Sequence, residues 1–131
     1  MSITSRGRAL LLLLLYSDVG PKDAPTVLRA GSHLDVPRMI APFGEEGCPM
    51  VRDDIVDKKT AHRPEVLATG EAGDVYLVHP FTVHAAQSNR VGRPRFIAQA
   101  SAEPRELVMT ERADGDFSPV ERAVRRGLGM T

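Results

Sequence analysis

The sequence predicts a mainly β domain with a short helix at its C-terminus. The chain contains 11 glycines and 10 prolines among 131 residues, which suits short strands joined by many turns. Short apolar runs such as Val75–Val78 are bounded by turn-forming residues, as strands are. At this length we expect one domain over residues 1–131.

The leucine run Leu10–Leu15 is the first strand candidate. An apolar run of this length between turn signals is typical of a strand that is buried on both faces. The propensity of leucine leaves a helix open at this point. Arg6 and Arg8 precede the run as in a signal peptide, but no small-residue cleavage site follows it. The run is also too short to span a bilayer.

Further strands are predicted at residues 26–29, 65–69, 75–78 and 95–98. Between the predicted strands 26–29 and 65–69, Pro37 suits the first turn of a short helix that begins near Asp35. Residues 44–64 carry many charges of both signs, which predicts a solvated or mobile loop such as a lid.

The C-terminal helix is predicted by its capping residues. Ser118 can cap the helix, Pro119 suits its first position, and Glu121 stands where the partner of a capping box is expected. Arginines near the end of the helix are favourable for its dipole. Gly127 is expected to end it.

Composition excludes several partners. Lysine plus arginine and aspartate plus glutamate both number 17, so the net charge is zero and no basic field attracts nucleic acid or an anionic membrane. Cys48 is the single cysteine, so an internal disulfide is excluded. A reducing cytoplasm fits this cysteine content.

The stretch between residues 73 and 99 carries the predicted chemistry. It runs from a strand through a bend to a loop and a second strand, so His84 and Arg95 each stand at a strand end. An imidazole can bind a divalent metal, and a guanidinium can hold a carboxylate through two hydrogen bonds. A carboxylic acid that also chelates the metal would need both groups. Fe(II) oxygenases that use 2-oxoglutarate have such an arrangement, with two histidines and one carboxylate on the metal.

The sequence also resembles the phytanoyl-CoA dioxygenase family of Fe(II)/2-oxoglutarate oxygenases. The resemblance rests on Gly73-Asp74, on His84, on Asn89 five residues later and on Arg95 eleven residues after the histidine. It extends to three short segments nearer the N-terminus: Ser17-Asp18-Val19, Ala24-Pro25-Thr26 and Gly31-Ser32-His33. The resemblance implies that His84 binds Fe(II), and that Arg95 and Asn89 bind 2-oxoglutarate. It implies a double-stranded β-helix, a jelly-roll or cupin-like fold, and favours a strand over a helix for the leucine run.

The remaining metal ligands are an open question in the sequence. His33-Leu34-Asp35 is a literal copy of the His-x-Asp pattern, and an extended backbone would put His33 and Asp35 on one face. The resemblance instead places this segment after the metal-binding His-x-Asp pair. The pair would then precede residue 1, and the chain would be the C-terminal part of a family member. His79 is expected to pack beside the pocket, and His62 to be exposed.

An incomplete β-helix has consequences for association and activity. Its open sheet edges would pair with other chains, which predicts an oligomer that completes the sheet or a partly ordered fragment. The first functional hypothesis is an oxygenase that uses O2 to oxidise or hydroxylate a small organic substrate entering under residues 44–64. The second is a non-catalytic β-domain that binds small carboxylates through Arg95, and the third is an inactive truncated family member.

Overall fold

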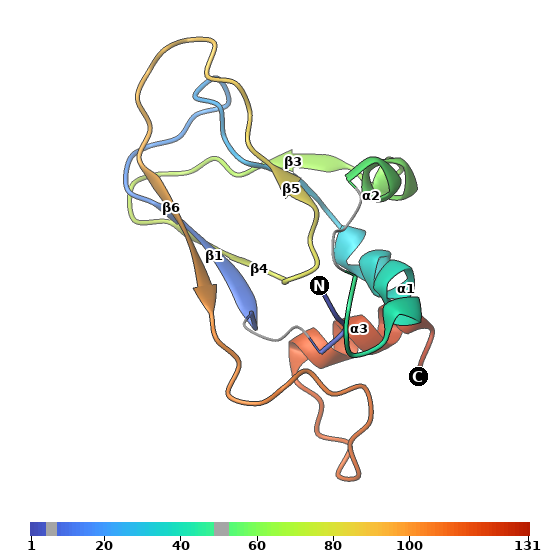
Figure 1. The fold of residues 1–131 in the computed structure, drawn as a ribbon. Coiled ribbons are helices and arrows are strands. Elements are labelled where there is room, and N and C mark those ends of the chain that lie inside the picture. The colour runs from blue at the N-terminus through green and yellow to red at the C-terminus, as the bar shows by residue number, and fades with distance from the viewer. Residues whose placement is uncertain (5–7, 49–52) are drawn as a thin grey trace.

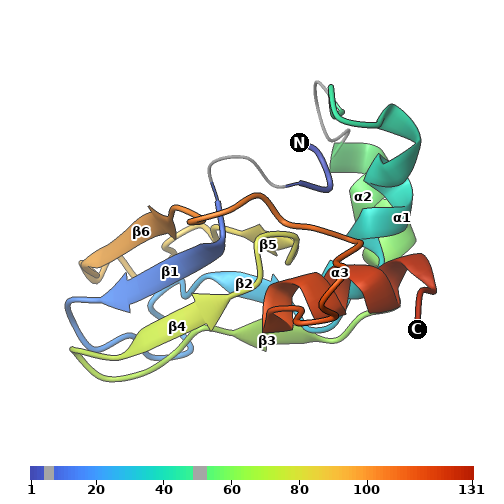
Figure 2. The same cartoon turned by 90° about the horizontal axis from the view of Figure 1, so that it is seen from below.

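Two three-stranded antiparallel sheets form the centre of the protein, and the helices gather at one end of them (Figure 1). The computed structural model describes residues 1–4, 8–48 and 53–131. The first sheet has the strand order β4-β1-β6 and the second the order β3-β2-β5. Figure 2 shows the helices beside the sheets, at the end opposite the turns that follow β1.

Four of the strands agree with short apolar segments of the sequence, whereas β5 was not predicted as a strand and β6 extends beyond the predicted residues 95–98. Their bounds are β1 Leu10–Leu15, β2 Val27–Arg29, β3 Glu65–Leu67, β4 Val75–Val78, β5 His84–Ala85 and β6 Ile97–Ala102. The leucine run is therefore a strand, and the helix alternative is wrong. As the middle strand of its sheet it pairs along its whole length with β6, and also with β4. These pairings outweigh the modest helix preference of leucine.

The two faces of β1 have different surroundings. Leu11, Leu13 and Leu15 are buried between the sheets, where Leu11 and Leu13 form a core cluster with Ala68 and Val78. The alternate leucines are only half-buried, so the prediction of burial on both faces is wrong. They belong to the outer face of the first sheet, which the strand register and the alternation of side chains define. This outer face comprises Leu10, Leu12, Leu14, Tyr16, Val75, Leu77, Phe96, Ala98, Ala100 and Ala102.

The helical segments are more numerous than the sequence indicates. They are η1 Ser32–Leu34, α1 Val36–Ile40, η2 Ala41–Phe43, α2 Asp53–Thr60 and α3 Pro119–Leu128. Helix α1 begins after Asp35 with proline in its first turn, as predicted. No helix in the described part of the chain is long and apolar enough to cross a membrane.

Helix α2 corrects the prediction of a solvated loop over residues 44–64. Arg29 of β2 ties the helix to the second sheet by donating to the carbonyl oxygen of Asp57 at 2.9 Å and to Oγ1 of Thr60 at 3.0 Å. Its guanidinium also lies 2.6 Å from the Asp57 carboxylate. The sequence does not reveal these contacts because Arg29 is distant along the chain. Part of the predicted loop, residues 49–52, lies outside the described residues, as does Arg6.

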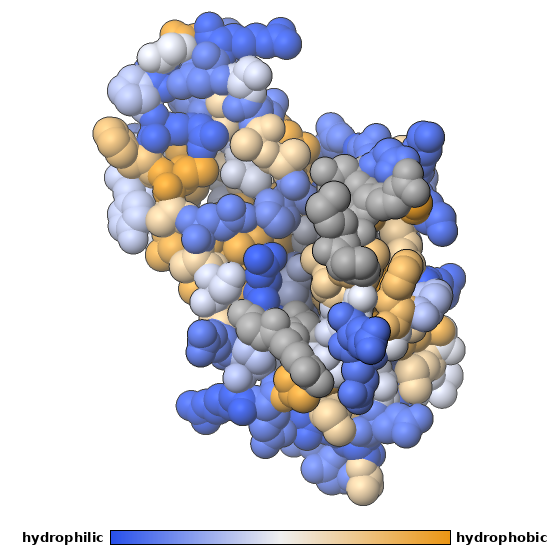
Figure 3. All heavy atoms as spheres, viewed as in Figure 1, coloured by the Kyte–Doolittle hydropathy of each residue, from blue (hydrophilic) through white to orange (hydrophobic). Residues whose placement is uncertain are grey.

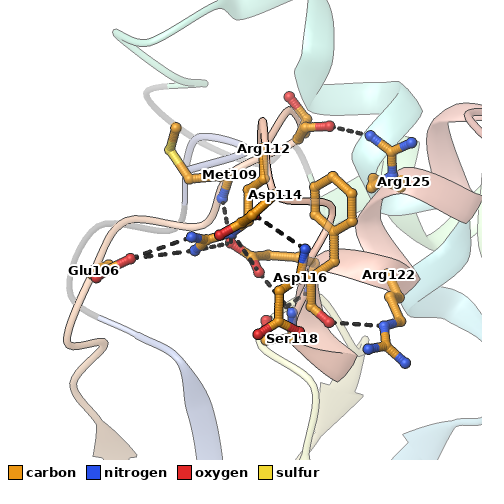
Figure 4. Close-up of polar contacts among 11 residues, drawn as sticks. Glu106, Met109, Arg112, Asp114, Asp116, Ser118, Arg122 and Arg125 are labelled. Atoms are coloured by element: carbon orange, nitrogen blue, oxygen red, sulfur yellow. Dashed lines mark hydrogen bonds and ion pairs between the residues drawn. The ribbon is translucent and has the colours of Figure 1, made fainter.

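The C-terminal helix α3 has the predicted capping box. Ser118 Oγ accepts from the backbone N–H of Glu121, and the Glu121 carboxylate accepts from the backbone N–H of Ser118 (Figure 4). The helix does not end at Gly127, as predicted, but at Leu128, and Gly129 caps it in the left-handed region with φ of 80°. Gly127 lies inside the helix, where a Cβ atom would be 2.7 Å from the carbonyl oxygen of Leu34.

We expect Gly127→Ala to destabilise the protein although alanine is the better helix former. The propensity gain is about 1 kcal/mol. The new methyl group would press on the backbone of η1, which yields less than a flexible side chain, so the overpacking cost should lie in the upper part of its usual range, about 2–3 kcal/mol. Chemical denaturation should show a net loss of about 1–2 kcal/mol in the free energy of unfolding. Arg126→Ala, an exposed change in the same helix, is the control. Equal or greater stability of Gly127→Ala would contradict the close approach of α3 to η1.

Candidate functional site

His84 is held in a defined orientation at the edge of the second sheet. It lies in β5 opposite Leu28 of β2. Its Nδ1 is 2.9 Å from the carbonyl oxygen of Thr82, which can only accept, so Nδ1 carries the proton. Nε2 is then an acceptor, and the side-chain amide of Gln99 lies 2.8 Å from it. An imidazole anchored through Nδ1–H to a carbonyl, with an available Nε2 lone pair, is typical of metal-binding histidines.

Arg95 approaches the same region from the first sheet. Gln99 is paired with Leu13, whose side chain lies between the sheets, and Ile97 is paired with Leu15. The extended pairing continues beyond β6, because the N–H of Tyr16 donates to the carbonyl oxygen of Phe96 at 2.8 Å. Alternation therefore puts Arg95 on the face that carries Ile97 and Gln99.

The environment of Arg95 leaves its guanidinium available to bind a ligand. The residue is half-buried and makes no hydrogen bond or ion pair with the residues that the structure describes. A guanidinium in such a position can hold a carboxylate through two parallel hydrogen bonds. His84 and Arg95 thus come from different sheets, and Gln99 connects the two edges.

A cavity of about 210 Å³ is bordered by His84. Its walls are mainly apolar and include Val36 of α1, Val56 of α2, Phe81 and Val83. Arg8 is at its border, whereas Arg95 is not among the residues that line it. Val56, which belongs to the segment predicted to cover the site, borders the same cavity as His84.

Asn89 does not face this region. Its side-chain amide donates to the carbonyl oxygen of Arg93 at 2.7 Å, and its Oδ1 accepts from the N–H of Gly92 at 3.0 Å. Asn89 is exposed, and both ends of its amide stabilise the loop between β5 and β6. These contacts support a role as a turn residue and give no support to the predicted contact with 2-oxoglutarate.

His33 and Asp35 do not form the chelating pair that an extended backbone would allow. His33 lies in the 3-10 helix η1, and its ring packs against His79 at a centroid distance of 5.0 Å. The Asp35 carboxylate accepts two hydrogen bonds from Arg63, at 2.8 and 2.7 Å. These bonds lower the pKa of Asp35, and burial lowers the pKa of His33. The alternative site is therefore corrected: helical geometry separates the two side chains, and Arg63 occupies the carboxylate.

His79 has a structural role next to these residues. Its Nδ1 accepts from the backbone N–H of Phe81 at 3.1 Å, so Nε2 carries the proton and faces the carbonyl oxygen of Val120 at 3.3 Å. Burial lowers the pKa of His79 to about 4, so the ring is neutral near pH 7. Both nitrogens are used, which leaves none for a metal.

The described residues show no complete set of metal ligands. Within residues 1–4, 8–48 and 53–131, no group of three or more histidine, cysteine, aspartate or glutamate side chains is arranged to hold a metal ion. Gln99 and Thr82, which orient His84, were not predicted from the sequence. Gln99 could have been recognised, because it stands four residues after Arg95 and thus on the same face of an extended strand.

Comparison with known proteins agrees with the sequence resemblance. The family model for phytanoyl-CoA dioxygenase (PhyH) matches residues 3–97, which include β1 to β5, His84 and Arg95. No curated protein and no solved structure shows significant similarity to the chain. The match covers well over half of the 131 residues. The chain therefore belongs to the phytanoyl-CoA dioxygenase family.

Proposed function

We propose that this protein acts as a non-haem Fe(II)/2-oxoglutarate-dependent oxygenase that oxidises a small organic substrate with O2. The observation that carries the proposal is the orientation of His84, whose Nδ1–H is fixed by the Thr82 carbonyl while Nε2 remains an acceptor. Membership of the family supports the same class of chemistry. The half-buried Arg95, in the extended segment before β6, supports recognition of a keto-acid carboxylate.

The residues fit the implied metal in part. His84 Nε2 would be one ligand, and Gln99 would leave it when the metal binds. Fe(II), when bound, supplies the means to activate O2, and such sites use two histidines and one carboxylate. At the proposed site the described residues offer one imidazole, that of His84, so we derive no reaction step at the metal. Arg95 would bind and orient the cosubstrate, and the apolar walls at Val36 and Val56 would exclude water from the cavity beside His84.

We also propose that the two sheets belong to a double-stranded β-helix. The support is their arrangement as antiparallel layers with a shared core, in which Leu28 of β2 packs against Leu11 and Leu13 of β1. Strands β5 and β6 stand at the edges of their sheets, next to the proposed site. A β-helix that closes past these edges would enclose His84 and Arg95.

Calorimetric titration with Mn(II), as a redox-inert substitute for Fe(II), and 2-oxoglutarate tests the proposal. We expect each ligand to strengthen binding of the other. His84→Ala should abolish the metal dependence, and Arg95→Ala should weaken 2-oxoglutarate binding by about 10- to 100-fold, the value of a charge-assisted bidentate contact. His62→Ala and Arg105→Ala, which change exposed residues, are matched controls. Binding that is unaffected by His84→Ala and Arg95→Ala would refute the assignment.

The proposed site contains only one imidazole among the described residues, that of His84, which favours a second candidate function. In this alternative to the oxygenase, the protein is a β-domain that binds small carboxylates without a metal. In that case 2-oxoglutarate or a similar acid would bind in the presence of a chelator, and Arg95→Ala but not His84→Ala would remove binding. Absence of binding by either ligand would favour the third hypothesis, a family member without activity of its own.

A further inference from the structure

The outer face of the first sheet is apolar along all three strands. Leu12 and Leu14 of β1 lie at its centre, paired with Leu77 and Val75 of β4 on one side and with alanines of β6 on the other. None of the side chains on this face is charged. In a sheet with one face in water, polar side chains on the outer face usually alternate along each strand with apolar side chains on the core face. Here the side chains on both faces of β1 are apolar.

Much of this face is exposed, and no helix of the described part of the chain has its main contacts with β1. The main contacts of α3 are with η1 and α1, and β1 has its main contacts with β4 and β6. Leu77, Tyr16 and Phe96 are 69%, 66% and 64% exposed. Figure 3 shows hydrophobic residues at the surface on the side of the molecule where Figure 1 draws β6 and β1. Large exposed apolar patches of this kind mark interaction sites.

We propose that a second copy of this chain covers the outer face of the first sheet, so that the protein is a symmetric dimer. Tyr16, Leu77 and Phe96 alone expose on the order of 400 Å² per copy, given about 200 Å² for a large side chain. With the half-buried leucines and the alanines, two copies would bury on the order of 1,000 Å² or more, which reaches the range of specific interfaces.

The chemistry of the face favours a copy of itself as the partner. An uncharged face meets its own copy without like-charge repulsion, and the net charge of zero adds no long-range repulsion between chains. Two sheets can pack face to face with their strands about 30° apart, as in a β-sandwich. This contact differs from edge pairing, because it uses side chains of the central strand β1 in place of backbone groups at the edges of β5 or β6. It does not depend on the proposed oxygenase activity.

Sedimentation velocity between about 1 and 100 μM tests the proposal across the range in which a standard interface associates. We expect the full chain to be a dimer at the higher concentrations. Leu77→Glu combined with Phe96→Glu should weaken association by at least about 100-fold, because two charges per copy would be desolvated. Val66→Glu is the matched control, since Val66 is an exposed strand residue of the other sheet, and it should dimerise like the unmodified chain.

Leu77→Ser is a second, milder variant that tests the same face if the doubly charged variant does not fold. It replaces one exposed side chain by a small polar one, should retain a cooperative thermal transition, and should weaken the dimer by about 10-fold. A monomer at all concentrations would overturn the proposal, as would open-ended assembly, which indicates edge pairing. Equal dimerisation of both face variants and the control would also overturn it. Binding of the monomer to phosphatidylcholine vesicles would assign the face to lipid and refute the dimer.

Discussion

Glu121→Ala is expected to lower the free energy of unfolding by about 3–5 kcal/mol, the usual cost of removing one partner from a buried ion pair. The Glu121 side chain is 4% exposed. Its carboxylate accepts from Nη2 of Arg112 at 2.8 Å and from the backbone N–H groups of Met109 and Ser118, also at 2.8 Å (Figure 4). Alanine would leave all of these donors without their acceptor, so the loop between β6 and α3 would lose its contacts with Glu121 and keep those that Arg125 and Val124 make with Thr110 and Val108.

Urea denaturation at pH 7 measures this effect, and Glu106→Gln is its matched control. Glu106 approaches the same arginine at 3.4 Å, but its side chain is 74% exposed. An exposed pair contributes little, so the control should change stability by less than about 0.5 kcal/mol. Similar losses for the two variants would show that the Glu121 cluster does not hold α3 in place.

The same cluster should make stability depend on pH in the acid range. Burial alone would raise the pKa of Glu121, but Arg112 and the N–H donors of Met109 and Ser118 outweigh it and lower the pKa to about 2. A carboxyl group with a depressed pKa stabilises the fold fully above its ordinary value of 4.5, and this contribution is lost as the pH falls towards 2. The difference in stability between the unmodified chain and Glu121→Gln should therefore shrink over this range.

Local signals in the sequence predicted β1 to β4 and the capped helix, but not β5 or the full extent of β6. Turn residues bound β2 and β4, and Ser118, Pro119 and Glu121 form the first turn of α3 as expected. The errors arose where contacts between distant segments determine the local structure. Helix α2 is held by Arg29 of β2. Glycine is needed at position 127 because the helix backbone there lies close to the carbonyl oxygen of Leu34.

The candidate site shows the same division. Spacing along the chain indicated His84 and Arg95, which lie in the edge strand β5 and in the segment just before β6, and their roles stay a prediction. The spacing could not indicate that Arg63 binds the Asp35 carboxylate or that Gln99 reaches Nε2 of His84. Each of these contacts depends on how separate strands and helices meet, which a short motif does not contain.

Leu13→Ala is the second change for which we expect a large effect, about 2–5 kcal/mol in the free energy of unfolding. Leu13 is 2% exposed and packs in the cluster with Leu11, Ala68 and Val78 between the two sheets. Its pairing partner on β6 is Gln99, which contacts His84 of the other sheet. A cavity at Leu13 would therefore loosen the packing that sets His84 and Arg95 relative to each other.

Two readouts together identify this role. Leu67→Ala, a change at a strand leucine that is 37% exposed, should cost less than about 1 kcal/mol, because truncation near the surface leaves no closed cavity. If the packing of the sheets positions the site, Leu13→Ala should also weaken 2-oxoglutarate binding under conditions in which the variant remains folded, whereas Leu67→Ala should not. Full stability of Leu13→Ala would mean that the sheets do not share a packed core at this residue. A destabilised variant with unchanged binding would mean that Arg95 holds its ligand independently of that core.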